Sequence, residues 1–428
     1  MRPPAPAPEA VSVIDYALVP RRPWESPELF SPRPPETEYG YVANRQRFGC
    51  TREELIARCR AERPHVDLVW TPESARLVPP AEVPWLVDAV RDRTHADLLH
   101  NLKNGLGLTA VWTTLAVLQA MKGYPVALLV TLVLLLGVVP ALQPAWALWR
   151  LRQKPVEYPR ELATTFRYQV WLGTRRMTTT WLVAGCLIVV MLTQVLAGIR
   201  IIARVKSPLG FGDVTRSMTV DRVIESAALV KDAVRSGELW RLLTAELMHG
   251  HPLHFLFNFM ALLAVGRLVE MHGHPLYVPA VFLVSALCAS AASFAFSAAP
   301  VSVGASGGIM GLIGFLAVIG IRRRHVVPRG FLKSIAMSIA LTAATGLIAR
   351  HFIDNAAHAG GLLGGVLLGL VYVQRRTGRS QQDDSATVHL NASTLAKVAG
   401  WVSAAALVVA TLATVWLLLA STRVYPQP

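Results

Sequence analysis

The stretch 304–311, Gly-Ala-Ser-Gly-Gly-Ile-Met-Gly, opens an uncharged apolar run of membrane length. A second such run downstream carries the stretch 354–361, Asp-Asn-Ala-Ala-His-Ala-Gly-Gly. A serine hydroxyl and an imidazole are both unfavourable in hydrocarbon unless they face a polar cavity, so polar groups inside a membrane are functional candidates by default. The two stretches therefore single out Ser306 and His358 as candidate site residues of a membrane protein.

The composition agrees with a membrane location. Of the 428 residues, 53% are hydrophobic, against about 45–50% in soluble proteins, which predicts a polytopic membrane protein. The formal charge of +15 could indicate a nucleic-acid partner. Lys and Arg gather, however, in short segments between apolar runs, where retention on the cytoplasmic side explains them. We therefore expect contact with the lipid bilayer and no binding of nucleic acid.

Composition also divides the chain into regions. The N-terminal residues are rich in proline, which blocks regular structure, and Thr51-Arg52-Glu53-Glu54 predicts a capping box that opens a short helix. The predicted regions are a disordered tail over 1–40, a small cytoplasmic region over 41–105, an added transmembrane hairpin over 106–148, a basic cytoplasmic linker over 149–177, a six-span core over 178–374, a cytoplasmic linker over 375–395, and a C-terminal span with a short tail over 396–428.

Nine apolar runs are each near the roughly 20 residues that a bilayer needs. The loops 150–177, 322–333 and 375–379 are rich in Arg and Lys and should face the cytoplasm, so we expect a cytoplasmic N-terminus and an external C-terminus. The nine predicted spans lie near 106–122, 125–148, 178–198, 251–270, 276–298, 304–321, 331–349, 355–374 and 396–420.

In this topology four polar residues share a depth. The spans that begin near 251, 304 and 355 all enter from the non-cytoplasmic side. At about 1.5 Å per helical residue, each polar residue lies within roughly 12 Å of the outer end of its span, close enough to admit water. The four residues are His254, Asn258, Ser306 and His358.

These four residues have the chemistry of a serine hydrolase. A serine nucleophile needs a base whose pKa lies near the working pH, and the imidazole of His358 suits Ser306. Attack on an amide creates an oxyanion, which an Asn amide, a His N–H and a backbone N–H at a helix N-terminus can stabilise. His254 and Asn258 are four residues apart and so share one helix face. The set predicts proteolysis within the membrane.

The glycines around these residues have their own explanation. Gly304 and Gly307 relieve the backbone around the serine. Three others allow the helices that carry the serine and the histidine to approach closely, as small residues do in membranes: Gly311, Gly361 and Gly365.

Together these residues resemble the rhomboid family of intramembrane serine proteases. The resemblance covers 178–374 and rests on GASGGIMG around Ser306, AAHAGGLLGG around His358, the stretch ELMHGHPLHFLFNFMALLAVGRLVE at 246–270, and the pair Trp240-Arg241. It implies an all-α polytopic membrane protein with a six-helix rhomboid-like core, two extra N-terminal spans and one extra C-terminal span. It also implies substrates that are transmembrane helices of other proteins, and no metal or organic cofactor.

The resemblance also implies roles for single residues. Ser306 would be the nucleophile, His358 the general base, and Asn258, His254 and the backbone N–H of Ser306 the oxyanion donors. Where some bacterial members have a tyrosine one turn after the nucleophile, this chain has Met310, which puts the rate in doubt more than the mechanism. Four further residues would be structural: Trp240 and Arg241 in the first loop, Glu270 as a helix-end anchor, and His249.

Other classes fit the sequence less well. A zinc protease needs His-Glu-x-x-His, which does not occur, and His249, His251 and His254 are not favoured as a metal site. Gly210-Phe211-Gly212-Asp213 superficially suggests an aspartyl protease, but no second deep carboxylate accompanies it. A transporter would show internal repeats and broken helices. A catalytically silent rhomboid-like protein that binds transmembrane helices stays open as the alternative. We expect the protein of this sequence to lie in a bacterial cytoplasmic membrane.

Overall fold

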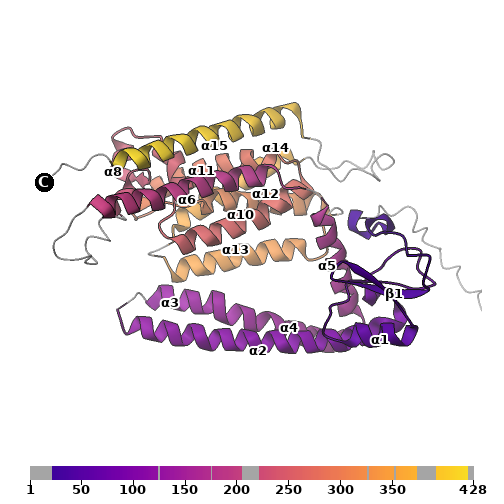
Figure 1. Ribbon diagram of the computed structural model, residues 1–428. Coiled ribbons are helices and arrows are strands. Elements are labelled where there is room, and N and C mark those ends of the chain that lie inside the picture. Colours follow the sequence, from indigo (N-terminus) through magenta and orange to yellow (C-terminus); the bar gives the residue numbers. More distant parts are fainter. Residues whose placement is uncertain are drawn as a thin grey trace, which may run out of the picture.

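The structure is a computed structural model of the full chain. It describes residues 22–123, 126–174, 176–204, 221–324, 327–350, 353–373 and 392–422. Gly210–Asp213 and most of the expected linker 375–395 therefore lie outside the described residues. The first region in the chain is a small mixed domain, and a set of long helices follows it (Figure 1).

The N-terminal domain is built on a three-stranded antiparallel sheet. Its strands β1 (Tyr39–Ala43), β2 (Gln46–Cys50) and β3 (Leu68–Trp70) lie in the order β2-β1-β3. A tight turn at Asn44 and Arg45, both with positive φ, joins β1 to β2. The helix α1 (Arg52–Arg60) follows, and the side chains of Thr51 and Glu54 form the predicted capping box at its start. The sheet itself had no signal strong enough to predict it.

The expectation of a disordered tail over 1–40 is wrong for the part that the structure describes. Pro23 and Pro27 each open a 3₁₀ turn, η2 (Pro23–Glu25) and η3 (Pro27–Leu29), because proline already holds the φ that a helix start requires. The indole of Trp24 in the first turn is fully buried against Tyr168 and Trp171. Residues 1–21 lie outside the described residues.

A long helical hairpin comes next. After the turns η4 (Pro80–Glu82) and η5 (Pro84–Leu86), α2 (Val87–Ala120) runs without a break, and the return limb consists of α3 (Val126–Val133), the π-helix η6 (Leu134–Val138) and α4 (Val139–Gln153). The limbs touch at glycines: a methyl group added to Gly105 would lie 2.6 Å from the Pro140 carbonyl oxygen. The expected boundary at 105 therefore falls inside one helix, and the expected linker 149–177 contains the helix α5 (Glu157–Gly173).

Six helices are long and apolar enough to cross a membrane among the residues that the structure describes. They are α6 (Thr179–Arg204), α10 (Pro252–His272), α11 (Tyr277–Phe296), α13 (Phe331–Ile348), α14 (Asn355–Tyr372) and α15 (Thr394–Ser421). The apolar helix α12 (Ser306–Arg322) is shorter, with 17 residues. The protein is thus an all-α polytopic membrane protein in its apolar part. The predicted spans 106–122 and 125–148 are not among the six and stay predictions.

Helix α12 lies at the centre of the apolar helices, with contacts to α10, α11, α13 and α14 (Figure 1). It is buried along most of its length, which explains how a short helix can hold its place. Helix α15 packs on α6 and α11. Helix α13 is the least enclosed of the six candidate spans, with 17% of its apolar window buried against 61% for α11. Figure 1 shows α13 beside α3 of the hairpin.

Candidate active site

The candidate site forms where α12 and α14 begin. Ser306 is the first residue of α12, and His358 lies in the first turn of α14. The Nε2 atom of His358 is 2.9 Å from the Ser306 hydroxyl oxygen, a hydrogen-bond distance. The structure thus brings together the two residues that the sequence predicts as nucleophile and base, although 52 residues separate them.

Close packing of two helices makes this distance possible. A methyl group at Gly361 would collide with the Gly307 carbonyl oxygen, and one at Gly365 would collide with the Gly311 carbonyl oxygen. The bare backbones of α12 and α14 therefore touch along one line, as small residues permit in membrane helices. Gly307 likewise allows a close helix contact, because a methyl group added to it would collide with the side chain of Ala289 on α11. Gly307 therefore has a role in helix packing, in addition to the role in the backbone around Ser306 that the sequence suggests.

A sharp turn delivers the chain to Ser306. The two-residue strand β5 (Val301–Ser302) pairs with β4 (Leu229–Val230), and Gly304 then adopts φ +133°, a value that favours glycine. The Gly304 N–H donates to the Ala245 carbonyl oxygen at 3.0 Å. A side chain at this glycine would also lie 2.7 Å from His254 Cε1, so His254 closes over the turn.

Asn258 supplies a buried donor next to this turn. It lies one helical turn after His254 on α10, and only 7% of it is exposed. Its Nδ2 atom has no hydrogen-bond partner among the residues that the structure describes. A buried amide N–H normally finds an acceptor, so an unpaired one calls for a reason. The Asn258 Nδ2 atom lies next to Gly304, 3.7 Å from where a methyl group added to Gly304 would be.

Trp240 and Arg241 make structural contacts within the described part of the loop between α6 and α10. The Arg241 guanidinium lies 4.5 Å from the Trp240 ring and donates to the carbonyl oxygens of Glu225 and Ala228. This loop also contains α8 (Lys231–Arg235), α9 (Arg241–Thr244) and η7 (Ala245–Leu247). Both Trp240 and Arg241 therefore brace the loop and make no described contact with Ser306.

His249 is a buried residue that packs against His254. It is 2% exposed, and its ring meets that of His254 edge to face, with centroids 5.3 Å apart. Burial lowers the pKa of His249 to about 3, so its imidazole is neutral. Gln194 fixes the backbone here by donating to the His249 carbonyl oxygen and accepting from the His249 N–H.

Glu270 anchors the start of α6 from the far end of α10. Its carboxylate accepts from the backbone N–H of Thr178 and Thr180, at 3.0 and 2.6 Å, and from the hydroxyl of Thr179. A carboxylate at a helix N-terminus satisfies free N–H groups and the helix dipole together.

Two carboxylates near the site had no predicted role. Glu246 is buried beside the first turn of α12, and Asp354 caps α14 by accepting from the Ala357 N–H at 3.0 Å. In the sequence, Glu246 is only the first residue of the stretch 246–270. The only indication in the sequence is that Glu246 is a single acid between apolar residues, and this pattern does not predict that its side chain is buried.

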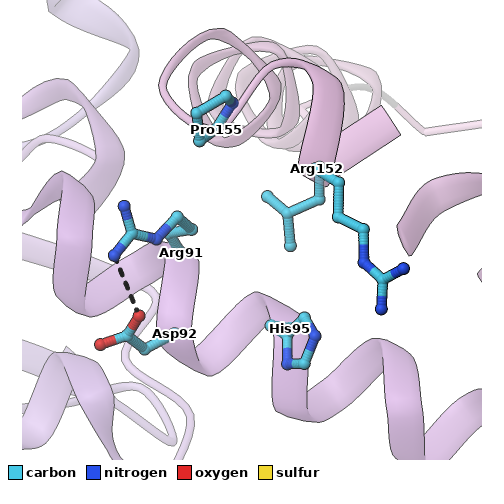
Figure 2. A pocket seen from close by; sticks show the side chains of 6 residues that line it. Arg91, Asp92, His95, Arg152 and Pro155 are labelled. Carbon is cyan, nitrogen blue, oxygen red and sulfur yellow. Dashed lines mark hydrogen bonds and ion pairs between the residues drawn. The ribbon is translucent and has the colours of Figure 1, made fainter. Parts of the chain in front are cut away.

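A pocket of about 500 Å³ lies on other elements (Figure 2). It is lined by residues from α2 and from the α4–α5 junction: Arg91, Asp92, His95, Leu151, Arg152 and Pro155. In Figure 2 the Arg91 guanidinium pairs with Asp92, so part of its charge is already neutralised. None of the predicted site residues lines this pocket. Within the described ranges, no group of three or more His, Cys, Asp or Glu side chains could hold a metal ion.

Comparison with known proteins finds similarity in the part of the chain that contains this site. Residues 236–375 match the Rhomboid domain. Over 150 residues, the chain is 35% identical to "Rhomboid protease GluP" of Bacillus subtilis (strain 168), a match that covers 35% of this chain and 29% of that protein. It is 30% identical over 161 residues to "RHOMBOID-like protein 1" of Arabidopsis thaliana, covering 37% of this chain and 40% of the relative.

The match has limits that bear on the whole protein. In both relatives the similarity spans less than half of their length. It begins at residue 236, so α6, the N-terminal domain, the hairpin and α15 lie outside the matched domain. Within it lie Trp240, Ser306 and His358. Residues 236–375 match the Rhomboid domain, and in this part the chain is similar to proteins of the rhomboid family.

Proposed function

We propose that the protein is an intramembrane serine endopeptidase that hydrolyses peptide bonds in or near transmembrane helices of other proteins. The observation that carries this proposal is the 2.9 Å contact between Ser306 Oγ and His358 Nε2 at the start of two buried helices. A serine and an imidazole in this geometry form the activated pair that acyl transfer requires. The name of the Bacillus subtilis relative, a rhomboid protease, supports the same class.

The reaction follows from the geometry in two steps. Ser306 Oγ attacks the substrate carbonyl carbon while His358 Nε2 takes the hydroxyl proton, and the carbonyl oxygen becomes an oxyanion. When this intermediate collapses, His358 gives the proton to the leaving amine and an acyl-enzyme remains on Ser306. Water then attacks the ester, with His358 again as base, and releases the acid and the free serine.

The oxyanion would be stabilised by the donors around Gly304. The unpaired Nδ2–H of Asn258 is the strongest candidate, because a preorganised donor with no competing acceptor loses nothing when the charge appears. His254 and the Ser306 N–H at the start of α12 would complete the set, and the helix dipole adds to the latter.

The substrate class follows from where the site lies. His254, Asn258, Ser306 and His358 all lie within the first two turns of their helices, so they share one level. A substrate helix must expose its backbone to reach this site, which favours segments with small or helix-breaking residues. We propose a bacterial cytoplasmic membrane as the location of the protein. We place the N-terminus in the cytoplasm, because Arg- and Lys-rich loops are expected on the cytoplasmic side of the membrane.

Labelling with a fluorescent fluorophosphonate tests the proposal without a known substrate. We expect labelling of the detergent-solubilised protein and its loss in both Ser306→Ala and His358→Ala. Absence of labelling in folded wild-type protein, beside an active control rhomboid, would instead favour a catalytically silent protein that binds transmembrane helices.

A further inference from the structure

Glu246 is a buried acid next to the nucleophile's helix. It lies in η7, outside the six candidate spans, and only 5% of it is exposed. Its Oε1 atom accepts a hydrogen bond from the Ser290 hydroxyl at 2.9 Å. A methyl group at Gly307 would lie 3.1 and 3.5 Å from its two carboxyl oxygens. The carboxyl group therefore packs against the first turn of α12, one residue from Ser306.

The surroundings of Glu246 offer it no described ion pair. A second carboxylate, Asp354, acts on its pKa through its charge, and this carboxylate accepts hydrogen bonds from the hydroxyls of Ser293 on α11 and Ser302 on β5. Other titratable or charged groups lie on the elements around it: His249 in the same loop, Arg241 on α9, Cys186 on α6, Cys288 on α11, His254 on α10 and His358 on α14.

Burial is the largest influence on the charge of this acid. It raises the pKa of Glu246 to about 8, and the Asp354 charge adds to this shift. The hydrogen bonds from the Ser290 hydroxyl and from the Gly308 N–H in the first turn of α12 oppose it. At neutral pH the carboxyl group is therefore mostly uncharged, and above pH 8 it becomes a carboxylate. A carboxylate at this point would lie close to the N–H groups at the start of α12, where the oxyanion of the reaction would form.

We propose that Glu246 is a positioning residue whose uncharged carboxyl group supports the start of α12 and whose carboxylate slows the reaction at Ser306. The inference rests on the proposed function. A carboxylate beside the start of α12 would repel the oxyanion, and at an effective dielectric of about 20 such repulsion between nearby charges would slow the reaction on the order of tenfold. The carboxyl group touches neither substrate nor Ser306 Oγ and acts through the helix start.

The test compares pH profiles of turnover. We would measure kcat with a fluorogenic transmembrane peptide from pH 6 to 9.5 for wild type and Glu246→Gln, whose amide keeps the shape and stays neutral. Wild-type kcat should fall about tenfold with a midpoint near pH 8, whereas Glu246→Gln should show no such fall. Active proteins with superimposable profiles would overturn this inference alone. Absence of turnover at every pH, together with absence of fluorophosphonate labelling, would overturn the proposed function as well.

A second pair of variants covers the case in which Glu246→Gln fails to fold. Ser290→Ala removes the hydrogen bond that favours the carboxylate, so the midpoint of the fall in kcat should move to higher pH. Ser285→Ala on the same helix is the matched control, because the Ser285 hydroxyl has no hydrogen-bond partner in the described part of the chain. The inference is wrong if both variants share the wild-type midpoint.

Discussion

At the scale of single residues, the site combines groups that a sequence can identify with groups that it cannot. Ser306 and His358 stand out because polar groups are rare in apolar runs, and their shared depth already suggested contact. Glu246 gave no such indication, because its hydrogen-bond partner Ser290 lies 44 residues away and its burial depends on how α11 and α12 pack. For Gly307 the sequence suggested only a role in the backbone around the serine, and the structure adds its contact with Ala289.

Asn258→Ala tests the oxyanion donor. We expect kcat to fall about 100-fold, as removal of one such donor typically does. KM should change little, because the donor matters most when charge develops on the substrate oxygen. Steady-state kinetics with a transmembrane peptide would measure both, and circular dichroism would check the fold. A kcat within twofold of wild type would exclude Asn258 from the oxyanion site.

At the scale of elements, the contact between α12 and α14 sets the distance between Ser306 and His358. The glycines predicted this contact from sequence, because Gly361 and Gly365 share one face of the helix that carries His358 and Gly311 follows Ser306 on the other helix. Element boundaries were harder to predict. The expected start of the hairpin at 106 falls inside α2, since a helix that continues from a polar to an apolar stretch leaves no sign at the crossing.

Gly365→Ala should separate these two helices. The added methyl group would collide with the Gly311 backbone, so α12 and α14 would move apart and the Ser306–His358 hydrogen bond would lengthen. We expect the rate of fluorophosphonate labelling to fall at least tenfold, because acylation needs the base within hydrogen-bond reach. Gly185→Ala on α6 is the control, since its methyl group would meet nothing within 4 Å. Equal labelling rates for the two variants would contradict this role of the contact.

At the scale of the whole molecule, an aromatic cluster joins the N-terminal domain to the rhomboid domain. Trp24 packs on Tyr168 and Trp171 of α5, and the Tyr168 hydroxyl is 2.7 Å from His272 Nε2 at the end of α10. The sequence could not predict this, because Trp24 and Tyr168 are far apart in the chain and no periodic pattern links them. The membrane part was easier to predict, since each apolar run carries its own signal of length and hydropathy.

Trp24→Ala should loosen the N-terminal domain without affecting the chemistry. Loss of this fully buried indole should cost about 3 kcal/mol. The cluster lies at the end of α10, and His254 lies near its start, roughly 27 Å away at 1.5 Å per residue. We expect faster limited proteolysis in the N-terminal domain and an unchanged rate of Ser306 labelling. The exposed Trp149 supplies the control variant, Trp149→Ala. A loss of labelling in Trp24→Ala would show instead that the domain controls the site.

The central claim is that Ser306 and His358 together cut transmembrane helices. The most direct test is to reconstitute wild type, Ser306→Ala and His358→Ala in liposomes with a model transmembrane substrate and to identify products by mass spectrometry. We predict that wild type alone releases two fragments, cut near the membrane level of Ser306. Cleavage by Ser306→Ala as fast as by wild type would contradict the claim.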